Sequence, residues 1–203
     1  MSARPLLLPL LAAMLLGSSG CDKLAASPQP QQLFRAADIS GAGFGRAFAL
    51  TDHKGRARTL ADYRGKVVAL LFGYVHCPDM CPLTLHELRR AQHALGAQGS
   101  GLQVLFVTLD PQHDTQAALA QAMANFDPAF VGLRGDAAQT RQVIGDFRLV
   151  LQRLAAAGKD AGEIGHSAGT YVFDRHGKLR LYAAYGTAHE AFEHDFRLLL
   201  SER

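Results

Sequence analysis

The sequence is short of several features that define whole classes of protein. Only three cysteines occur in 203 residues, which excludes a small secreted fold stapled by many disulfides. The formal net charge is only +3, with no long run of one sign, so the charge does not indicate a nucleic-acid partner. No apolar run reaches the ~20 residues that a membrane-spanning helix needs. Hydrophobic residues at 48% and charged residues at 19% instead describe an ordinary globular domain.

The first twenty residues have the pattern of an export signal. Arg4 gives a positively charged N-terminal region, Leu6–Leu16 form the apolar region, and Gly17–Gly20 form a region of small residues before the expected cleavage site. Cys21 follows directly, and the junction resembles a bacterial lipoprotein processing site, with Ser18 in place of the usual leucine. The resemblance implies acylation of Cys21 and a place on the periplasmic face of the inner membrane. The alternative is a soluble periplasmic protein with an unmodified Cys21, and either location is oxidising.

The rest of the chain divides into a tether and one domain. Residues 21–43 are rich in Gln, Pro, Ala and Ser, which predicts a flexible tether. Residues 44–203 are long enough for one well-cored domain. Without the first twenty residues, in which Arg4 is the only charged residue, the net charge falls from +3 to +2.

The pattern of the domain predicts an α/β, thioredoxin-like fold: a central mixed sheet flanked by helices, with an N-terminal hairpin. Two continuous apolar runs, Val67–Tyr74 and Leu102–Leu109, are typical of strands buried on both faces. The remaining elements expected from spacing and turn residues are a first hairpin over 47–60, helices over 83–95, 115–126 (capped by Asp114 or Thr115) and 137–154, a second hairpin joining 170–173 to 179–184, and a C-terminal helix.

Cys77 and Cys81 lie just after the first buried strand, where the next helix begins. Reactive groups of open α/β sheets gather beyond the carboxyl ends of the strands. Cysteines four residues apart share one side of a helical turn, and a helix N-terminus favours the thiolate that attacks disulfides and binds metals. The pair therefore predicts either a redox site or half of a site for a soft metal such as Cu(I) or zinc.

A metal site with two thiolates needs a further donor, and a histidine is the expected one. Of nine histidines, six lie where solvated side chains are expected: His53, His86, His93, His176, His189 and His194. His76 and His113 lie near the reactive edge. His166 follows a Gly-rich loop and precedes a strand, in a region that neighbours the cysteine loop in thioredoxin-like folds.

Three sequence blocks resemble the Sco (SenC) family, which is involved in cytochrome c oxidase assembly. Phe72–Pro82 carries the Cys-Pro-Asp-Met-Cys-Pro signature, Val107–Thr115 is similar to the second family block, and His166–Asp174 to the third. The resemblance runs from about Phe44 to the C-terminus. It implies a site for copper, as Cu(I) or as Cu(II), formed by Cys77, Cys81 and His166.

The resemblance also implies a function, with alternatives. The first is a copper metallochaperone that delivers copper to the binuclear copper site of cytochrome c oxidase and is kept reduced by a periplasmic thioredoxin-like reductant. The second is a thiol-disulfide oxidoreductase that reduces the cysteines of that site, with Cys77 and Cys81 as the redox pair. Peroxide chemistry is a third, weaker option. Of these, the metallochaperone is the reading adopted, so we expect no enzyme activity beyond possible disulfide reduction.

The sequence departs from the family pattern at three positions: Val75 replaces a common Thr, His113 a frequent Arg, and Gly165 the usual Asp before the histidine. An Asp at position 165 could hydrogen-bond near the His166 ligand, and the loss of such a partner changes metal affinity by roughly 10–100-fold. Gly165 is therefore expected to affect the affinity for copper. Asp110 and Asp79 are ambiguous, because each is either a turn former or a residue that steers the metal or tunes the thiolates.

Overall fold

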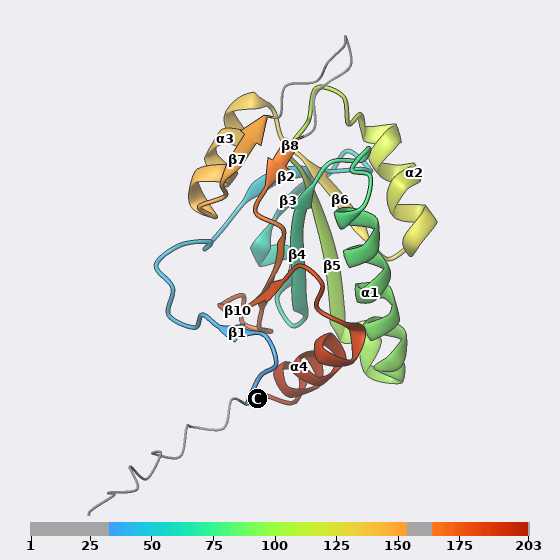
Figure 1. The fold of residues 1–203 in the computed structure, drawn as a ribbon, viewed down its shortest axis with the longest axis vertical. Helices are drawn as coiled ribbons and strands as arrows, with labels where there is room; N and C mark the ends of the chain where they lie inside the picture. Colours follow the sequence, from blue (N-terminus) through green and yellow to red (C-terminus); the bar gives the residue numbers. More distant parts are fainter. Residues whose placement is uncertain (1–32, 154–163, 203) are drawn as a thin grey trace, which may run out of the picture. The chain divides into compact units, whose positions relative to one another are not determined.

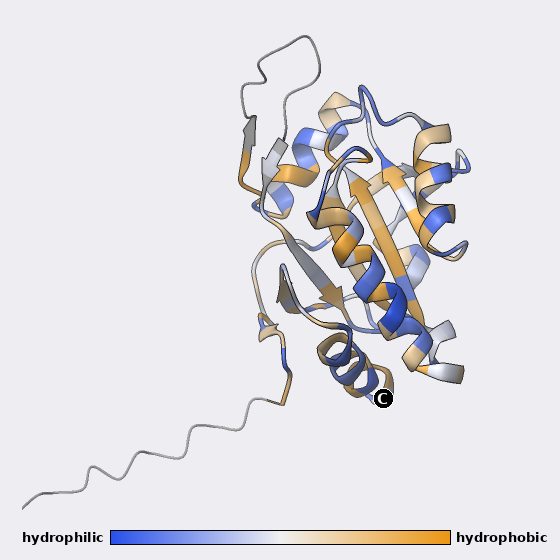
Figure 2. Ribbon diagram, turned by 45° about the vertical axis from the view of Figure 1, so that its right-hand side comes forward, coloured by the Kyte–Doolittle hydropathy of each residue, from blue (hydrophilic) through white to orange (hydrophobic). Residues whose placement is uncertain are grey.

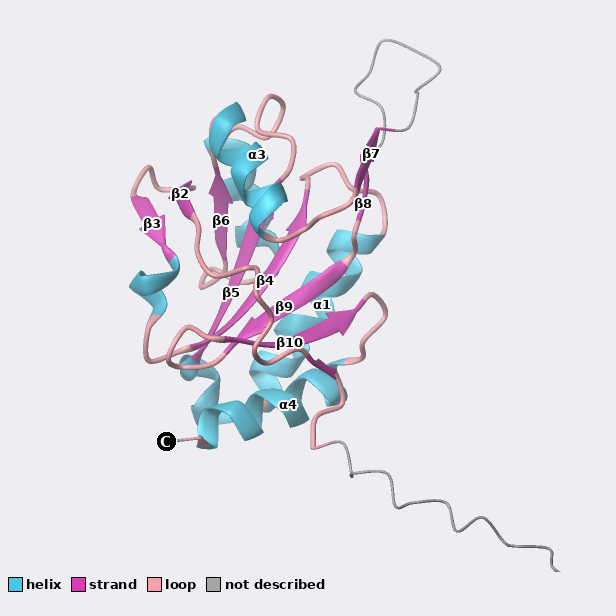
Figure 3. Cartoon of the chain, turned by 90° about the vertical axis from the view of Figure 1, so that its left-hand side faces the viewer, coloured by secondary structure: helices cyan, strands magenta, loops and turns pink. Residues whose placement is uncertain are grey.

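The computed structural model describes residues 33–153 and 164–202, except the side chains of Gln152, Arg153, Ile164 and His166. Eight strands form one sheet in the order β1-β10-β9-β4-β5-β6-β2-β3 (Figure 1). Their bounds are β1 Ala37–Asp38, β2 Ala49–Asp52, β3 Ala57–Thr59, β4 Val67–Gly73, β5 Leu102–Thr108, β6 Val131–Arg134, β9 Gly169–Phe173 and β10 Leu179–Ala184. Strands β7 (Leu151–Arg153) and β8 (Ile164–His166) form a separate pair (Figure 3).

The centre of the sheet is mixed, as the sequence predicts. Strands β4, β5 and β6 run parallel, and β9 pairs with β4 in the antiparallel direction. Every residue of β4 and β5 is buried, and Figure 2 shows these central strands as hydrophobic. The continuous apolar runs therefore mark strands that are covered on both faces. The thioredoxin-like fold and the N-terminal hairpin, which is β2–β3, are confirmed.

Helices cover both faces of the sheet. The bounds are α1 Met80–Ala94, α2 Gln116–Phe126, α3 Ala137–Asp146 and α4 His189–Ser201, with the short 3₁₀ turns η1 Leu60–Tyr63 and η2 Gly96–Gly101. One core cluster joins α1, α2 and α4 to the sheet through residues such as Leu88, Met123 and Phe196. The other joins α3 and η1 to the sheet through Val143 and Leu60. Within the described residues, no helix is long and apolar enough to cross a membrane.

Two boundaries differ from the sequence-based expectation. The helix expected over 137–154 ends at Asp146, because Arg148 adopts a left-handed φ of 52° and the chain turns into β7. The longer helix was expected because Val143, Phe147, Val150 and Leu154 would form one apolar stripe; the stripe breaks at Arg148, and Val150 is 72% exposed. The helix expected over 83–95 begins earlier, at Met80, so that Cys81 and Pro82 lie in its first turn, where proline is tolerated.

Part of the segment expected to be a tether over 21–43 belongs to the folded unit, which begins at Leu33. Phe34 is buried in the core, and Ala37–Asp38 pairs with β10. The Asp195 carboxylate of α4 accepts hydrogen bonds from the backbone N–H groups of Arg35 and Ala36, at 2.8 Å each. The expected signal over 1–20, the acylated Cys21 and the remaining tether lie outside the described residues.

Candidate metal centre

The loop between β4 and α1 brings Cys77 and Cys81 together. The backbone N–H of Cys77 donates to the carbonyl of Tyr74 at 3.1 Å, which turns the chain after the strand. Cys81 then lies in the first turn of α1. Both residues are buried, and both are thiols rather than halves of a disulfide. The cysteine pair therefore lies where β4 leads into α1, as the sequence predicts.

The two thiols interact directly, which affects how easily they ionise. The hydrogen bond with Cys77, then burial, then the charge on Cys77 raise the pKa of the Cys81 thiol above its ordinary value. At Cys81 these effects outweigh the preference of a helix N-terminus for the thiolate. A metal ion that binds both sulfurs must therefore displace a proton that this environment retains.

Gly73, the last residue of β4, makes room for Cys81. A Cβ atom at this position would collide with Cys81 Sγ and would lie 3.0 Å from a ring carbon of Phe106. The sulfur therefore packs directly against the backbone of β4. Only a residue without a Cβ atom fits here, because the first turn of α1 approaches the end of β4 closely.

Asp114 supports the cysteine loop, a role that the sequence reasoning missed. Its Oδ2 accepts hydrogen bonds from the backbone N–H of Val75 at 2.9 Å and from Thr108 Oγ1 at 2.5 Å. Burial raises the pKa of Asp114, although both hydrogen bonds act in the opposite direction. The cap of α2 is Thr115, whose Oγ1 accepts from the N–H of Ala118. The available signal was the position of Asp114 in the loop after a buried parallel strand.

Asp110 lies at the same edge, directly after β5. Its backbone N–H donates to Thr108 Oγ1 at 3.0 Å, and its Oδ2 lies 2.7 Å from His113 Nδ1. The other carboxylate oxygen is buried and has no hydrogen-bond partner in the part of the chain that the structure describes. Because its backbone N–H bonds back to Thr108, Asp110 is a turn residue, as one reading of the sequence proposed.

The other polar residues named at this edge are more exposed. His113 is half exposed, and His76 and Asp79 are exposed. Asp79 precedes α1 and makes no side-chain hydrogen bond as its cap.

The structure places the backbone of His166 at the end of β8, opposite Leu151 of β7. Its side chain lies outside the described part of the structure. Three residues later β9 begins, and because β9 is antiparallel to β4, its first residues lie where β4 ends: Thr170 pairs with Leu71. Ala168, Gly169 and Thr170 line the same crevice as Met80 and Cys81. Among the side chains that are described, no group of three His, Cys, Asp or Glu could hold a metal ion.

The other histidines differ in their surroundings. His86, His93 and His176 are exposed, as expected. His53 is half-buried, and its Nδ1 accepts a hydrogen bond from the backbone N–H of Gly132 at 3.0 Å. His189 Nδ1 lies between the carboxylates of Glu87 and Glu190, at 3.3 and 3.0 Å. His194 Nδ1 lies 2.9 Å from the Asp195 carboxylate.

The family model described as SCO1/SenC matches residues 36–201. The chain belongs to the SCO1/SenC family. Among curated Sco relatives, the bovine mitochondrial SCO2 homolog is 39% identical over 140 residues, which is 66% of this chain and 52% of the relative. The chain spans only about half the length of that relative.

Solved Sco structures agree with the fold. Bradyrhizobium japonicum ScoI with copper bound is 32% identical, with a TM-score of 0.71 over 77% of this chain and 99% of that one. Apo Sco1 from Thermus thermophilus is 30% identical, with a TM-score of 0.73 over 82% and 97%. These Sco proteins share the thioredoxin-like core, and the first of them holds copper.

Proposed function

We propose that this SCO1/SenC protein is a copper metallochaperone that delivers copper to the binuclear copper site of cytochrome c oxidase. The observation that carries the proposal is the direct contact between the Cys77 and Cys81 thiols at the carboxyl end of β4. Copper in the related structure from B. japonicum supports it, as does membership of a family that implies oxidase assembly.

The donors suit copper. Two adjacent, buried thiols are soft ligands once they lose their protons, and such ligands select Cu(I). His166 is the proposed third ligand, since an imidazole suits both Cu(I) and Cu(II) sites. Its segment leads into β9, which begins at the edge where β4 ends. Three protein ligands leave the ion accessible to the ligands of an acceptor protein, so copper would pass on by ligand exchange.

A thiol-disulfide oxidoreductase is the second candidate, in which Cys77 and Cys81 reduce the cysteines of the same oxidase site. One observation favours it: Cys77 and Cys81 are both buried thiols, and the Cys81 thiol has a hydrogen bond with Cys77. In either role the pair must be reduced, so we propose a periplasmic thioredoxin-like reductant as a partner. We further propose that acylated Cys21 holds the protein at the periplasmic face of the inner membrane.

Metal analysis of the reduced protein tests the copper site. We expect Cys77→Ala, Cys81→Ala and His166→Ala each to lose most bound copper in competition with a copper chelator. His113→Ala is the matched control, because His113 is an exposed histidine near the same edge, and it should retain copper. Copper retention that is unchanged in His166→Ala would refute the proposed ligand set.

The same variants separate the two functions. A metallochaperone should transfer copper stoichiometrically to the isolated copper-binding domain of the oxidase, and His166→Ala should abolish transfer while leaving disulfide formation intact. If the protein is instead a reductase, the wild type should bind copper poorly, and both wild type and His166→Ala should reduce disulfides of the acceptor.

A further inference from the structure

A groove lies between η1, the segment before β2 and the turn that joins β9 to β10. Its volume is about 290 Å³, and the buried side chains of Phe48 and Leu60 contribute to its lining. Arg46, Arg64 and His176 are the lining residues that can carry charge, and no Asp or Glu of the described chain lines the groove. A groove bordered by basic groups alone favours an anionic ligand.

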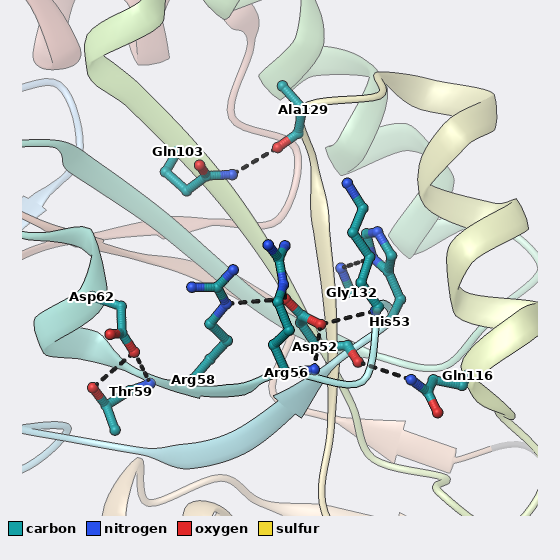
Figure 4. Close-up of polar contacts among 11 residues, drawn as sticks. Asp52, His53, Arg56, Arg58, Thr59, Asp62, Gln103, Gln116, Ala129 and Gly132 are labelled. Carbon is teal, nitrogen blue, oxygen red and sulfur yellow. Dashed lines mark hydrogen bonds and ion pairs between the residues drawn. The ribbon is translucent and has the colours of Figure 1, made fainter.

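The two arginines of this groove have no partner for their charge. The side chains of Arg46 and Arg64 are exposed, and neither forms an ion pair or a hydrogen bond with any residue that the structure describes. Arg56 and Arg58, in the neighbouring hairpin, instead both bond to Asp52, as Figure 4 shows. Arg46 and Arg64 therefore present guanidinium groups that are free to bind an oxyanion, for which their planar sets of N–H donors are well suited.

Two carboxylates lie close to the groove, but both already have donors. Asp62 accepts from the backbone N–H and the hydroxyl of Thr59, which Figure 4 also shows. Asp174, in the β9–β10 turn, is 4% exposed and accepts from the backbone N–H groups of His176 and Lys178, at 2.9 Å each. Neither carboxylate forms an ion pair with the arginines of the groove, so the groove keeps its positive charge.

The groove and the cysteine pair lie at opposite ends of β4. Cys77 follows the last residue of this strand, whereas the turn that holds Arg64 precedes its first residue. The seven residues of β4 separate the two ends by about 20 Å. The backbone N–H of Gly65 donates to the carbonyl of Arg175 at 2.8 Å, and Arg175 Nε donates to the Gly65 carbonyl at 3.1 Å. The turn before β4 and the β9–β10 turn are thereby joined into one basic end of the sheet.

We propose that the groove binds the phosphate group of an anionic phospholipid, with Arg46 and Arg64 as donors to its oxygens. A phosphate diester carries one negative charge and offers two unesterified oxygens, which two guanidinium groups can bind. The choice of a lipid over soluble phosphate rests on the proposed membrane attachment at Cys21. Leu33 follows twelve positions later (33 − 21 = 12), and twelve residues span at most about 40 Å. Binding by this end of the sheet would leave the cysteine pair directed away from the bilayer, toward an acceptor protein.

Vesicle binding tests the proposal without an acyl chain and without copper. The protein used is the chain from position 21 with Cys21→Ser, which keeps the whole folded unit, since that unit begins at Leu33. It is sedimented with vesicles of phosphatidylcholine alone or of phosphatidylcholine with phosphatidylglycerol. We expect binding only to the vesicles that contain the anionic phosphatidylglycerol, and weaker binding as the salt concentration rises.

We expect Arg46→Gln and Arg64→Gln each to weaken binding to the anionic vesicles about 5-fold, the contribution of one basic residue near an anionic membrane surface. Arg90→Gln is the matched control, because it removes the same charge from α1, which covers the other face of the sheet. It should bind nearly as tightly as the wild type. Copper retention and denaturant unfolding should be unchanged in Arg46→Gln and Arg64→Gln, since neither side chain has a partner among the described residues.

Equal binding of the wild type to the two kinds of vesicle would overturn the proposal. Equal weakening by Arg64→Gln and Arg90→Gln would also overturn it, because binding would then depend on net charge alone. Binding of inorganic phosphate, detected as a shift of the Arg64 Nε–H signal in NMR spectra, without binding to the anionic vesicles would exclude a lipid as the ligand. The proposed function fails separately: an unmodified Cys21 in the mass spectrum of the extracted protein, or a reduced wild type that binds no copper, would contradict it and leave the vesicle result unchanged.

Discussion

At the residue scale, the geometry of the thiol pair depends on Asp114. A single oxygen, Oδ2, accepts both the Val75 N–H from the cysteine loop and the Thr108 hydroxyl from the end of β5. This carboxylate therefore connects the loop after β4 to the neighbouring strand. Groups of this kind orient metal ligands without binding the metal, and their loss typically costs 10–100-fold in affinity.

We predict that Asp114→Ala weakens copper retention about 10- to 100-fold, because the Val75 N–H loses its acceptor and the loop loses its link to β5. Asp114→Asn should have a smaller effect, since one amide oxygen can accept both hydrogen bonds. Copper competition with a chelator, in parallel with denaturant unfolding, measures the two effects. Equal copper affinities for wild type and Asp114→Ala would show that the loop holds its shape without this residue.

At the element scale, the β2–β3 hairpin is organised around one buried carboxylate (Figure 4). Asp52 accepts from the backbone N–H groups of Lys54 and Arg56 and from the Nε atoms of Arg56 and Arg58, at 2.8–3.1 Å. Gly55, with a φ of 81°, completes the turn. Figure 4 also shows the bond from the Gly132 N–H to His53, which attaches the hairpin to β6.

We predict that Asp52→Asn lowers the free energy of unfolding at neutral pH by about 2 kcal/mol. Burial alone would raise the pKa of Asp52, but the four hydrogen bonds outweigh it and lower the pKa to about 2, from an ordinary value of 3.8; each pKa unit corresponds to about 1.4 kcal/mol. A lowered carboxyl pKa stabilises the fold above pH 3.8, and this contribution is lost as the pH falls toward 2.

Urea unfolding between pH 7 and pH 3 measures this dependence. The difference between wild type and Asp52→Asn should be constant near neutrality and shrink below about pH 4. Asp62→Asn gives the comparison for an exposed carboxylate: the hydrogen bonds from Thr59 also lower the pKa of Asp62, so its effect should depend on pH in the same direction but be smaller, because solvent weakens exposed interactions. A difference that is independent of pH would mean that the substitution acts by packing rather than by charge.

At the scale of the whole molecule, the segment from Leu33 to β1 is part of the fold. Phe34 is buried in the same cluster as Cys77 and Cys81. β1 extends the sheet beside β10, and Asp195, 2% exposed, holds two backbone N–H groups of this segment. Removing the segment would expose apolar surface and leave a buried carboxylate without two of its donors.

We therefore predict that a chain starting at Leu33 is as stable as the full chain, whereas a chain starting at Phe44 is less stable by at least about 3 kcal/mol, the lower range for loss of a buried Phe. Denaturant unfolding of both truncations is the measurement. Phe34→Ala in the longer truncation should reproduce much of the loss. Equal stability of the two truncations would return the domain boundary to residue 44.

Local patterns predicted the regular parts of the molecule well. The apolar runs of β4 and β5, the β9–β10 hairpin and the helical stripe with Phe192 and Phe196 all occur where expected. The helix expected over 137–154 was too long, because Val150 fits an apolar stripe in sequence but follows the left-handed Arg148. Strand β6, with only four residues, has too little periodicity to be recognised.

The sequence by itself determined the chemistry: two cysteines four residues apart after a buried strand, and a family signature around them. The chain pattern does not show how the pair is supported. Only the tertiary structure brings β9 antiparallel against β4, so that Thr170 and Cys81 line one crevice. It alone joins Asp114 to the cysteine loop across 39 positions. The physical reason is that residue spacing specifies local geometry, whereas strand order decides which distant side chains share an edge of the sheet.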